Sequence, residues 1–158
     1  MAVEMRPGVW TDLFKSIDAQ ATGKGRELLT LIATAIEKQA KINASVGAHR
    51  YGTPTPARPG TGPAVISGNL RRSLTHEPIR TLGPGHWTTR VGTATGFYPS
   101  YGGHSRTPAN KYGFYLERGL RNGAKYPFLV PAFNHVTGIG MGAMFRAIYG
   151  DKAWKRVF

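Results

Sequence analysis

The 158-residue chain contains no cysteine, which excludes a disulfide framework and a metal site built from thiolates. It also has no run of about 18 apolar residues, so we expect no membrane-spanning helix and no membrane partner. The first ten residues, MAVEMRPGVW, lack the basic and then apolar pattern of a signal peptide, so we expect no secretion. These absences are compatible with a reducing cytoplasm.

Acidic residues are scarce, at 8 against 21 lysines and arginines, and the net charge is +13. Residues 1–37 carry a net charge of −1, whereas residues 38–158 carry +14. One part of the surface is therefore expected to be far more basic than the rest, and such a surface attracts polyanions such as nucleic acid. Two alternatives stay open: scattered cations that keep the protein soluble, and an acidic protein partner.

Patterns that carry chemistry are also missing from the sequence. It has no G-x-S-x-G, no P-loop and no paired carboxylates. The run Gly138–Ala143 matches G-x-G-x-x-A, but it lacks the preceding strand and the acid about 20 residues later that a dinucleotide site needs. Five histidines show no spacing typical of metal ligands: His49, His76, His86, His104 and His135. We therefore expect a protein that is not an enzyme and that holds no cofactor or metal.

The chain does have apolar residues for a core, at 41% hydrophobic and 11% aromatic, and we expect one domain over residues 1–158. Residues 26–43 predict the clearest helix. Five apolar residues and one glutamine form a stripe along it: Leu28, Leu31, Ile32, Ala35, Ile36 and Gln39. Residues 1–23 are expected to form a lead-in helix or arm, ended by Gly23 and Gly25, that docks on the body or on a neighbouring subunit. Helical spacing places five apolar residues on one side of it: Val9, Trp10, Leu13, Phe14 and Ile17.

Residues 44–68 are rich in glycine and proline and predict an extended loop. Loops of this length are usually functional or disordered. We interpret residues 47–64 as an insertion that either contacts DNA, orders against a neighbouring subunit, or stays in solvent.

Alternation of apolar and polar residues predicts two strands, Leu70–Ile79 and Trp87–Val91, paired as a hairpin around the turn Gly83–Gly85. A third strand is expected around Lys111–Leu116. From Pro131 onward the pattern favours a helix, interrupted by Gly138, Gly140 and Gly142 before it resumes and ends at Gly150. The expected fold class is α+β: a small antiparallel sheet with residues 26–43 and the C-terminal helix packed on one face.

The aromatic stretch Lys111–Phe133 is expected to lie against this core. Its glycines at 119 and 123 permit left-handed backbone, which predicts a turn over Leu120–Ala124. The stretch holds one acid, Glu117, whose carboxylate needs a cation or several donors if it is partly buried. We expect a structural role for it, paired with an arginine such as Arg71 or Arg72, rather than a functional carboxylate.

Two blocks resemble the phage tail-completion, or minor tail protein Z-like, proteins of long-tailed phages. One block is Tyr112 and Tyr115–Gly119, followed by Pro127–Leu129 and Pro131–Phe133, and the other is Ser67–Ser73, with glycine, leucine and arginine at the family's positions. Arg118 stands where the family commonly has an aromatic residue. The two blocks lie in the family's order and cover roughly the central half of the chain.

The resemblance implies a structural virion protein of the neck that completes the tail and joins it to the capsid. It implies a ring, expected to be a hexamer, that contacts connector and tail-tube proteins and surrounds packaged DNA without reading its sequence. The residues expected to face the lumen or DNA are Arg50, Arg58, Arg71, Arg72 and Arg106. Those expected to anchor the core or a subunit contact are Tyr112, Tyr115, Glu117, Gly119, Pro127, Phe128, Pro131 and Phe133. The alternative is a free-standing basic nucleic-acid-binding module with residues 44–68 as its arm.

Overall fold

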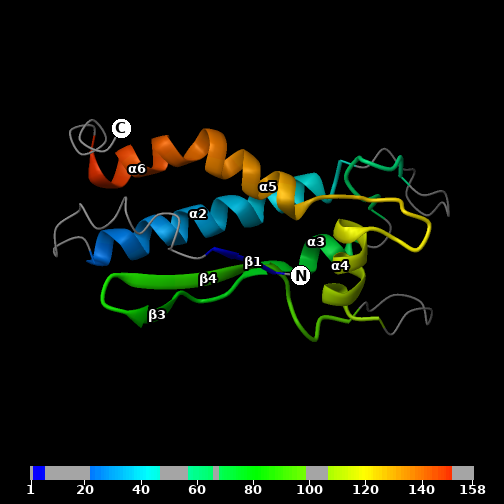
Figure 1. The fold of residues 1–158 in the computed structure, drawn as a ribbon, viewed down its shortest axis with the longest axis horizontal. Helices are drawn as coiled ribbons and strands as arrows, with labels where there is room; N and C mark the ends of the chain where they lie inside the picture. Colours follow the sequence, from blue (N-terminus) through cyan, green and yellow to red (C-terminus); the bar gives the residue numbers. More distant parts are fainter. Residues whose placement is uncertain (1, 6–21, 47–56, 66–67, 99–106, 151–158) are drawn as a thin grey trace.

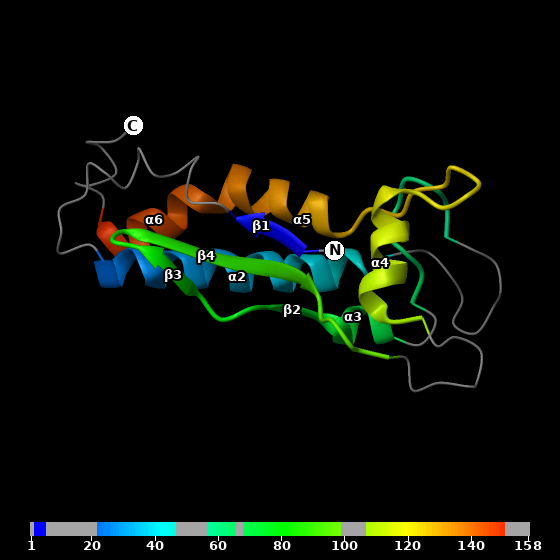
Figure 2. The same ribbon diagram turned by 60° about the horizontal axis from the view of Figure 1, so that its bottom comes forward.

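The protein is described by a computed structural model over residues 2–5, 22–46, 57–65, 68–98 and 107–150. Figures 1 and 2 show an elongated molecule in which a sheet lies against two long helical elements. In chain order the elements are β1 (Ala2–Met5), α2 (Thr22–Asn43), α3 (Asn69–Ser73), β2 (Leu74–His76), β3 (Arg80–Gly83), β4 (His86–Thr93), α4 (Ala109–Arg118), α5 (Leu129–His135), the π-helical turn Val136–Gly140, and α6 (Met141–Tyr149).

The sheet is antiparallel and is organised around β4, its longest strand. On one edge β1 pairs with β4, with Val3 opposite Val91. On the other edge β2 and β3 pair with successive parts of β4, with His76 opposite Val91 and Arg80 opposite Thr88. The sheet with its covering helices confirms the predicted α+β class.

The predicted hairpin is confirmed, with corrections to its first strand. Inward and outward positions alternate along β4 as expected: Trp87, Thr89 and Val91 are buried, and Arg90 is exposed. The first strand is wrong at its start, because residues 69–73 form the short helix α3 and pairing begins at Leu74. It is also interrupted between His76 and Arg80, where proline at position 78 has no N–H to give to a ladder.

Helix α2 lies between the sheet and the α5–α6 arm (Figure 1) and supplies much of the core. Its buried hydrophobic residues are Leu28, Ile32, Ala33, Ile36 and Ala40. The predicted stripe is wrong at Leu31, which is exposed, while Ala35 and Gln39 are only partly buried. The helix also starts at Thr22, so Gly23 and Gly25 lie inside it instead of ending a lead-in helix.

The C-terminal arm runs antiparallel to α2 in both views. Phe128, Leu129, Ala132, Val136 and Phe145 bury its inner side in the same core. The predicted interruption is confirmed as a change of helix type: residues 136–140, which include Gly138 and Gly140, form a π-helical turn, whereas Gly142 lies inside α6. Gly150, with φ 84°, ends α6 as expected. α5 begins at Leu129, two residues before the predicted start, and Pro131 stands in its first turn.

The third strand expected around Lys111–Leu116 is wrong: this segment is helix α4, and β1 supplies the other strand. The helical periodicity is present in its inner side, formed by Ala109, Tyr112, Gly113, Leu116 and Glu117 at spacings of three and four residues. The glycine obscures that pattern in the sequence. There is little room for a side chain at this glycine, since an added Cβ would lie 3.2 Å from Thr93 Cγ2.

Two predicted segments are described only in part. The amphipathic lead-in helix over residues 9–17 lies outside the described residues. Of the predicted loop 44–68, Ala57 is buried and Gly60 donates its N–H to the carbonyl of Lys125 at 2.8 Å. Residues 57–60 therefore pack against the turn that follows α4.

Candidate functional site: a basic end around Glu117

Four pieces of chain lie together at one end of the molecule (Figures 1 and 2), and they carry most of the cations among the described residues. We call this the basic end; it consists of residues 37–46, 57–65, 68–73 and 107–127. Its cations are Lys38, Lys41, Arg58, Arg71, Arg72, Lys111, Arg118, Arg121 and Lys125. Against these nine stand two acids, Glu37 and Glu117, whereas the other described residues carry five cations and three acids.

Local packing explains why these pieces meet. α3 lies against α4, where the absent side chain of Gly113 leaves room for Leu70, whose Cδ1 would be 3.3 Å from a Cβ there. After α4 the chain turns back, and Tyr126 donates its N–H to the carbonyl of Leu116 at 2.8 Å. The predicted turn over residues 120–124 is confirmed, because Leu120 donates to the carbonyl of Ala124 at 2.9 Å.

The carboxylate of Glu117 fastens the end of α4 to the start of α5. Its Oε2 accepts the backbone N–H groups of Phe128 at 2.9 Å and Leu129 at 3.1 Å, and its Oε1 accepts that of Val130 at 2.9 Å. These donors belong to the first turn of α5, where backbone N–H groups have no partner within the helix. We call this arrangement the Glu117 clasp.

The clasp corrects the expected partner of Glu117. The carboxylate is buried, and the structure satisfies it with three backbone donors instead of Arg71 or Arg72. A negative charge at a helix N-terminus is also favoured by the helix dipole. Both arginines remain on the surface of α3, and Arg72 donates to the side chain of Asn69.

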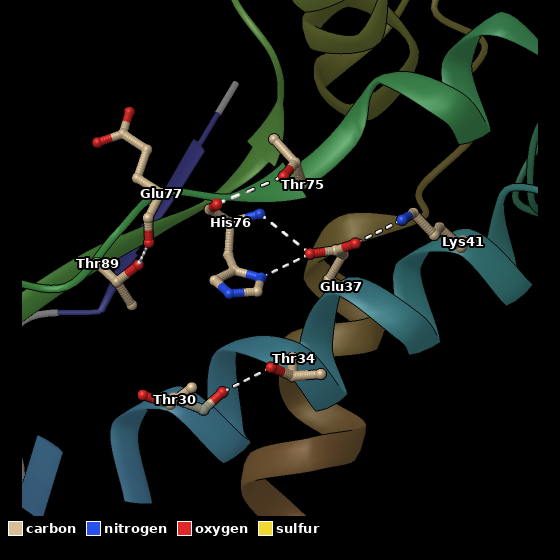
Figure 3. A network of polar contacts seen from close by, with 8 residues as sticks. All are labelled: Thr30, Thr34, Glu37, Lys41, Thr75, His76, Glu77 and Thr89. Atoms are coloured by element: carbon tan, nitrogen blue, oxygen red, sulfur yellow. Dashed lines mark hydrogen bonds and ion pairs between the residues drawn. The ribbon is translucent and has the colours of Figure 1, made fainter. Parts of the chain in front are cut away.

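The second acid, Glu37, ties α2 to β2 (Figure 3). Its Oε2 accepts the backbone N–H of His76 at 3.1 Å and lies 2.6 Å from His76 Nδ1, while Oε1 pairs with Lys41. Burial acts to raise the pKa of Glu37, but the hydrogen bonds and charges of Lys41 and His76 outweigh it, and the pKa lies below its ordinary value. Both acids of the basic end are thus occupied within the fold.

The outer face of α4 exposes two aromatic rings between two cations. Phe114 is 40% exposed and Tyr115 44% exposed, and their rings meet edge to face at 5.9 Å. The guanidinium of Arg118 lies over the ring of Phe114, 5.7 Å from its centre. Lys111 shares this face at the i−4 position from Tyr115. Exposed aromatic and arginine side chains are typical of binding surfaces for proteins and for nucleic acids.

A groove of about 560 Å³ runs along the outer side of α2 toward α3. It is lined by Thr34, Glu37, Lys38, Lys41, Ile42, Ser45, Val46 and Arg71. Its apolar residues are well exposed, at 47% for Ile42 and 66% for Val46. The groove therefore offers an apolar strip bordered by cations.

The structure places the predicted site residues in different settings. Arg58, Arg71 and Arg72 are exposed and share the basic end, whereas Arg50 and Arg106 lie outside the described residues. Among the predicted anchors, Phe128 is fully buried and Glu117 is buried, whereas Tyr115 and Pro131 are exposed. The partly buried anchors are Tyr112, Gly119, Pro127 and Phe133. Burial raises the pKa of the Tyr112 hydroxyl.

Sequence reasoning missed six cations of this end: Lys38, Lys41, Lys111, Arg118, Arg121 and Lys125. The spacing of Lys111, Phe114, Tyr115 and Arg118 at three, four and seven residues is a helix-face signal that the strand prediction concealed. No pattern in the sequence predicts the groove, because it forms between α2 and α3, which lie far apart in the chain.

No family model, no curated protein and no solved structure matches this chain. Within the described ranges, no helix combines the length and apolarity needed to cross a membrane. The same ranges contain no group of three or more histidine, aspartate or glutamate side chains arranged to hold a metal ion.

Proposed function

We propose that this chain is a structural protein of the phage head–tail junction, which assembles as a ring at the neck, completes the tail and joins it to the capsid. The resemblance of its two sequence blocks to tail-completion proteins is the origin of this proposal. The observation that supports it further is the Glu117 clasp, because it joins the two parts of the larger block to each other.

In the clasp, Glu117 from one part of the larger block holds the backbone of Phe128 and Leu129 from another part. The smaller block joins the same unit, since Leu70 of α3 packs at Gly113 of α4. Both blocks thus build one corner of the fold. This supports a role in assembly.

The basic end supports the second part of the proposal, a position beside packaged DNA. Nine cations there face two acids that are already engaged, so its surface attracts phosphate without a fixed base-reading geometry. A ring that lines a channel with such a surface leaves DNA free to slide. The copies of the chain and the neighbouring connector and tail-tube proteins are the expected protein partners.

Electron microscopy of the purified protein and of the phage particles that contain its gene tests the proposal. We expect closed rings, or stacks of rings on tail ends, and the protein present at the neck of mature particles. Mature particles that contain all the other neck proteins but lack this protein would contradict the proposal.

A free-standing nucleic-acid-binding module is the second candidate, and the exposed aromatic rings between cations on α4 favour it. The two candidates differ in mass and in partner. A free module stays monomeric or dimeric and binds DNA by itself, whereas a neck protein forms rings or attaches to tails. Light scattering of the isolated protein, followed by a tail-joining assay, separates them.

A further inference from the structure

The groove along α2 has the chemistry of a peptide-binding surface. Ile42 and Val46 expose apolar area along its floor, and Lys38 and Arg71 stand beside them on α2 and α3. An apolar strip left in water favours a partner that covers it. The cations beside it favour a partner that carries carboxylates.

The remaining polar groups of the groove are already engaged. The hydroxyl of Thr34 donates to the carbonyl of Thr30, and that of Ser45 donates to the carbonyl of Lys41. The Lys41 ammonium is held by Glu37. In the described part of the chain, Lys38 and Arg71 have no such acidic partner. Two cations thus remain for a ligand.

We propose that this groove binds residues 9–18 of a second copy of the chain. That segment, VWTDLFKSID, has apolar residues at helical spacing and two aspartates, Asp12 and Asp18. Its apolar side matches the strip formed by Ile42 and Val46, and its carboxylates match Lys38 and Arg71. Helix-in-groove binding of this kind uses apolar anchors three and four residues apart.

Chain length limits how far this segment can extend along the groove of its own chain. Ile17 is five residues from Thr22 and reaches at most about 17 Å from it. Ile42 is twenty residues farther along α2, which is about 30 Å. At the other end Val9 is four residues from Met5, which pairs with β4 on the sheet edge opposite to β2. We therefore assign the occupant to a neighbouring molecule, and the double-cysteine chain described below tests this assignment.

The segment precedes the N-terminus of α2 and the groove lies along its C-terminal half, so the contact is head to tail unless two copies exchange their segments. Repeated contacts of this type close into a ring or continue as a filament. The inference deepens the proposed ring assembly and rests on it for the biological role of the contact. The contact itself is testable without any phage component.

Because the chain has no cysteine, engineered cysteines report this contact directly. A Leu13→Cys protein is mixed with an Ile42→Cys protein under oxidising conditions, and covalent heterodimer is measured by non-reducing electrophoresis. The control mixture replaces Ile42→Cys by Ile139→Cys, at a position that is 77% exposed on the π-helical turn. We expect at least fivefold more heterodimer in the first mixture. Equal yields, or no heterodimer in either, would overturn the proposal.

A chain that carries both Leu13→Cys and Ile42→Cys separates contact within a molecule from contact between molecules. We expect a ladder of covalent multimers. A monomer with an internal disulfide would show that the segment folds onto its own groove, which overturns the proposal.

Charge reversal tests the carboxylate–cation match. Asp12→Lys with Asp18→Lys is expected to weaken self-association at least tenfold in sedimentation equilibrium, and Lys38→Glu with Arg71→Glu in the same chain is expected to restore it. Failure of the second pair to restore association contradicts the proposed match. If the cross-link forms while the protein is missing from phage particles, the proposed function fails and the contact stands. If the protein forms a ring at the neck but the cross-link does not form, the proposed function stands and the proposed contact fails.

Discussion

The Oε1 atom of Glu117 accepts the backbone N–H of Val130 at 2.9 Å, thirteen residues farther along the chain. This bond and its two companions fix the angle between α4 and α5, because both helices are held at their ends. The turn between them depends on Gly119, whose φ of 127° is strained for any residue with a side chain. A carboxylate and a glycine two residues apart thus set the corner that joins the aromatic helix to the C-terminal arm.

Glu117→Gln should lower the stability of the protein. The glutamine amide has one oxygen where the carboxylate has two, and its NH₂ group would face a backbone donor. Loss of buried hydrogen bonds to a charged group costs about 1–3 kcal/mol, or about 2–4 °C in Tm for each kcal/mol in a chain of this size. Differential scanning calorimetry measures the change.

The matched control for that variant is Glu77→Gln, since Glu77 makes a solvent-exposed ion pair with Arg80 and should leave Tm within about 1 °C. The ability of the Glu117→Gln variant to assemble into rings provides a second measurement. Unchanged stability together with unchanged assembly would show that the clasp has no structural role.

Gly25→Ala should be destabilising although alanine is the better helix former. A Cβ at this position would lie 2.7 Å from Cζ3 of Trp87, which is a large buried ring with little room to move. Gly23→Ala, two residues earlier in α2, meets nothing within 4 Å and should instead stabilise by up to about 1 kcal/mol. Urea unfolding compares the two variants. The same sign of change in both would contradict the contact between α2 and β4.

Glu37 should contribute stability that disappears in acid. The pKa of Glu37 lies below its ordinary value of 4.5, so the folded state favours the charged form more strongly than the unfolded state does. The contribution is complete above pH 4.5 and is lost as pH falls through the lowered folded value. Glu37→Gln should therefore destabilise at pH 7, and its effect should be smaller at pH 3.

Urea unfolding at both pH values tests this dependence, with Glu27→Gln, an exposed acid on the same helix, as the control. A Glu37→Gln variant whose loss of stability is the same at pH 3 as at pH 7 would show that the contacts to Lys41 and His76 do not depend on ionisation.

The sequence predicts those helices and strands whose pattern of residues is complete within the element itself. The long helix and the hairpin follow from periodicity, and the interrupted C-terminal helix follows from three glycines at alternate positions. The sequence of α4 suggests a strand, because Gly113 breaks the helical apolar pattern. The reason for a glycine at this position is visible only in the fold, where Leu70 and Thr93 lie beside it. β1 has no signal of its own: four residues become a strand because the edge of β4 is open.

The site is harder to predict, because the groups that bind its carboxylate belong to the backbone and are not encoded by a particular residue type. The need of Glu117 for a cation or several donors follows from its setting, but the donors are backbone N–H groups that every residue from 128 to 130 possesses. The charge excess after residue 37 is visible in the sequence. Its concentration at one end depends on the packing of α3 against α4 and cannot be obtained from counting.

DNA binding should depend on where the cations lie, and not only on how many there are. Replacing Arg72, Lys111, Arg118 and Arg121 by alanine removes four charges from the basic end. Replacing Lys24, Arg26, Arg80 and Arg90 removes the same number elsewhere. Each residue that contacts phosphate contributes about 0.9 to the slope of log Kd against log salt.

We therefore expect the basic-end variant to bind duplex DNA at least tenfold more weakly and to show a smaller salt slope, while the control variant keeps most of the slope. Fluorescence anisotropy with labelled duplexes of two unrelated sequences measures both quantities, and equal affinity for the two sequences is expected because phosphate contacts do not distinguish bases. Identical losses in the two variants would mean that the protein attracts DNA through its total charge, and the basic end would then have no special part in it.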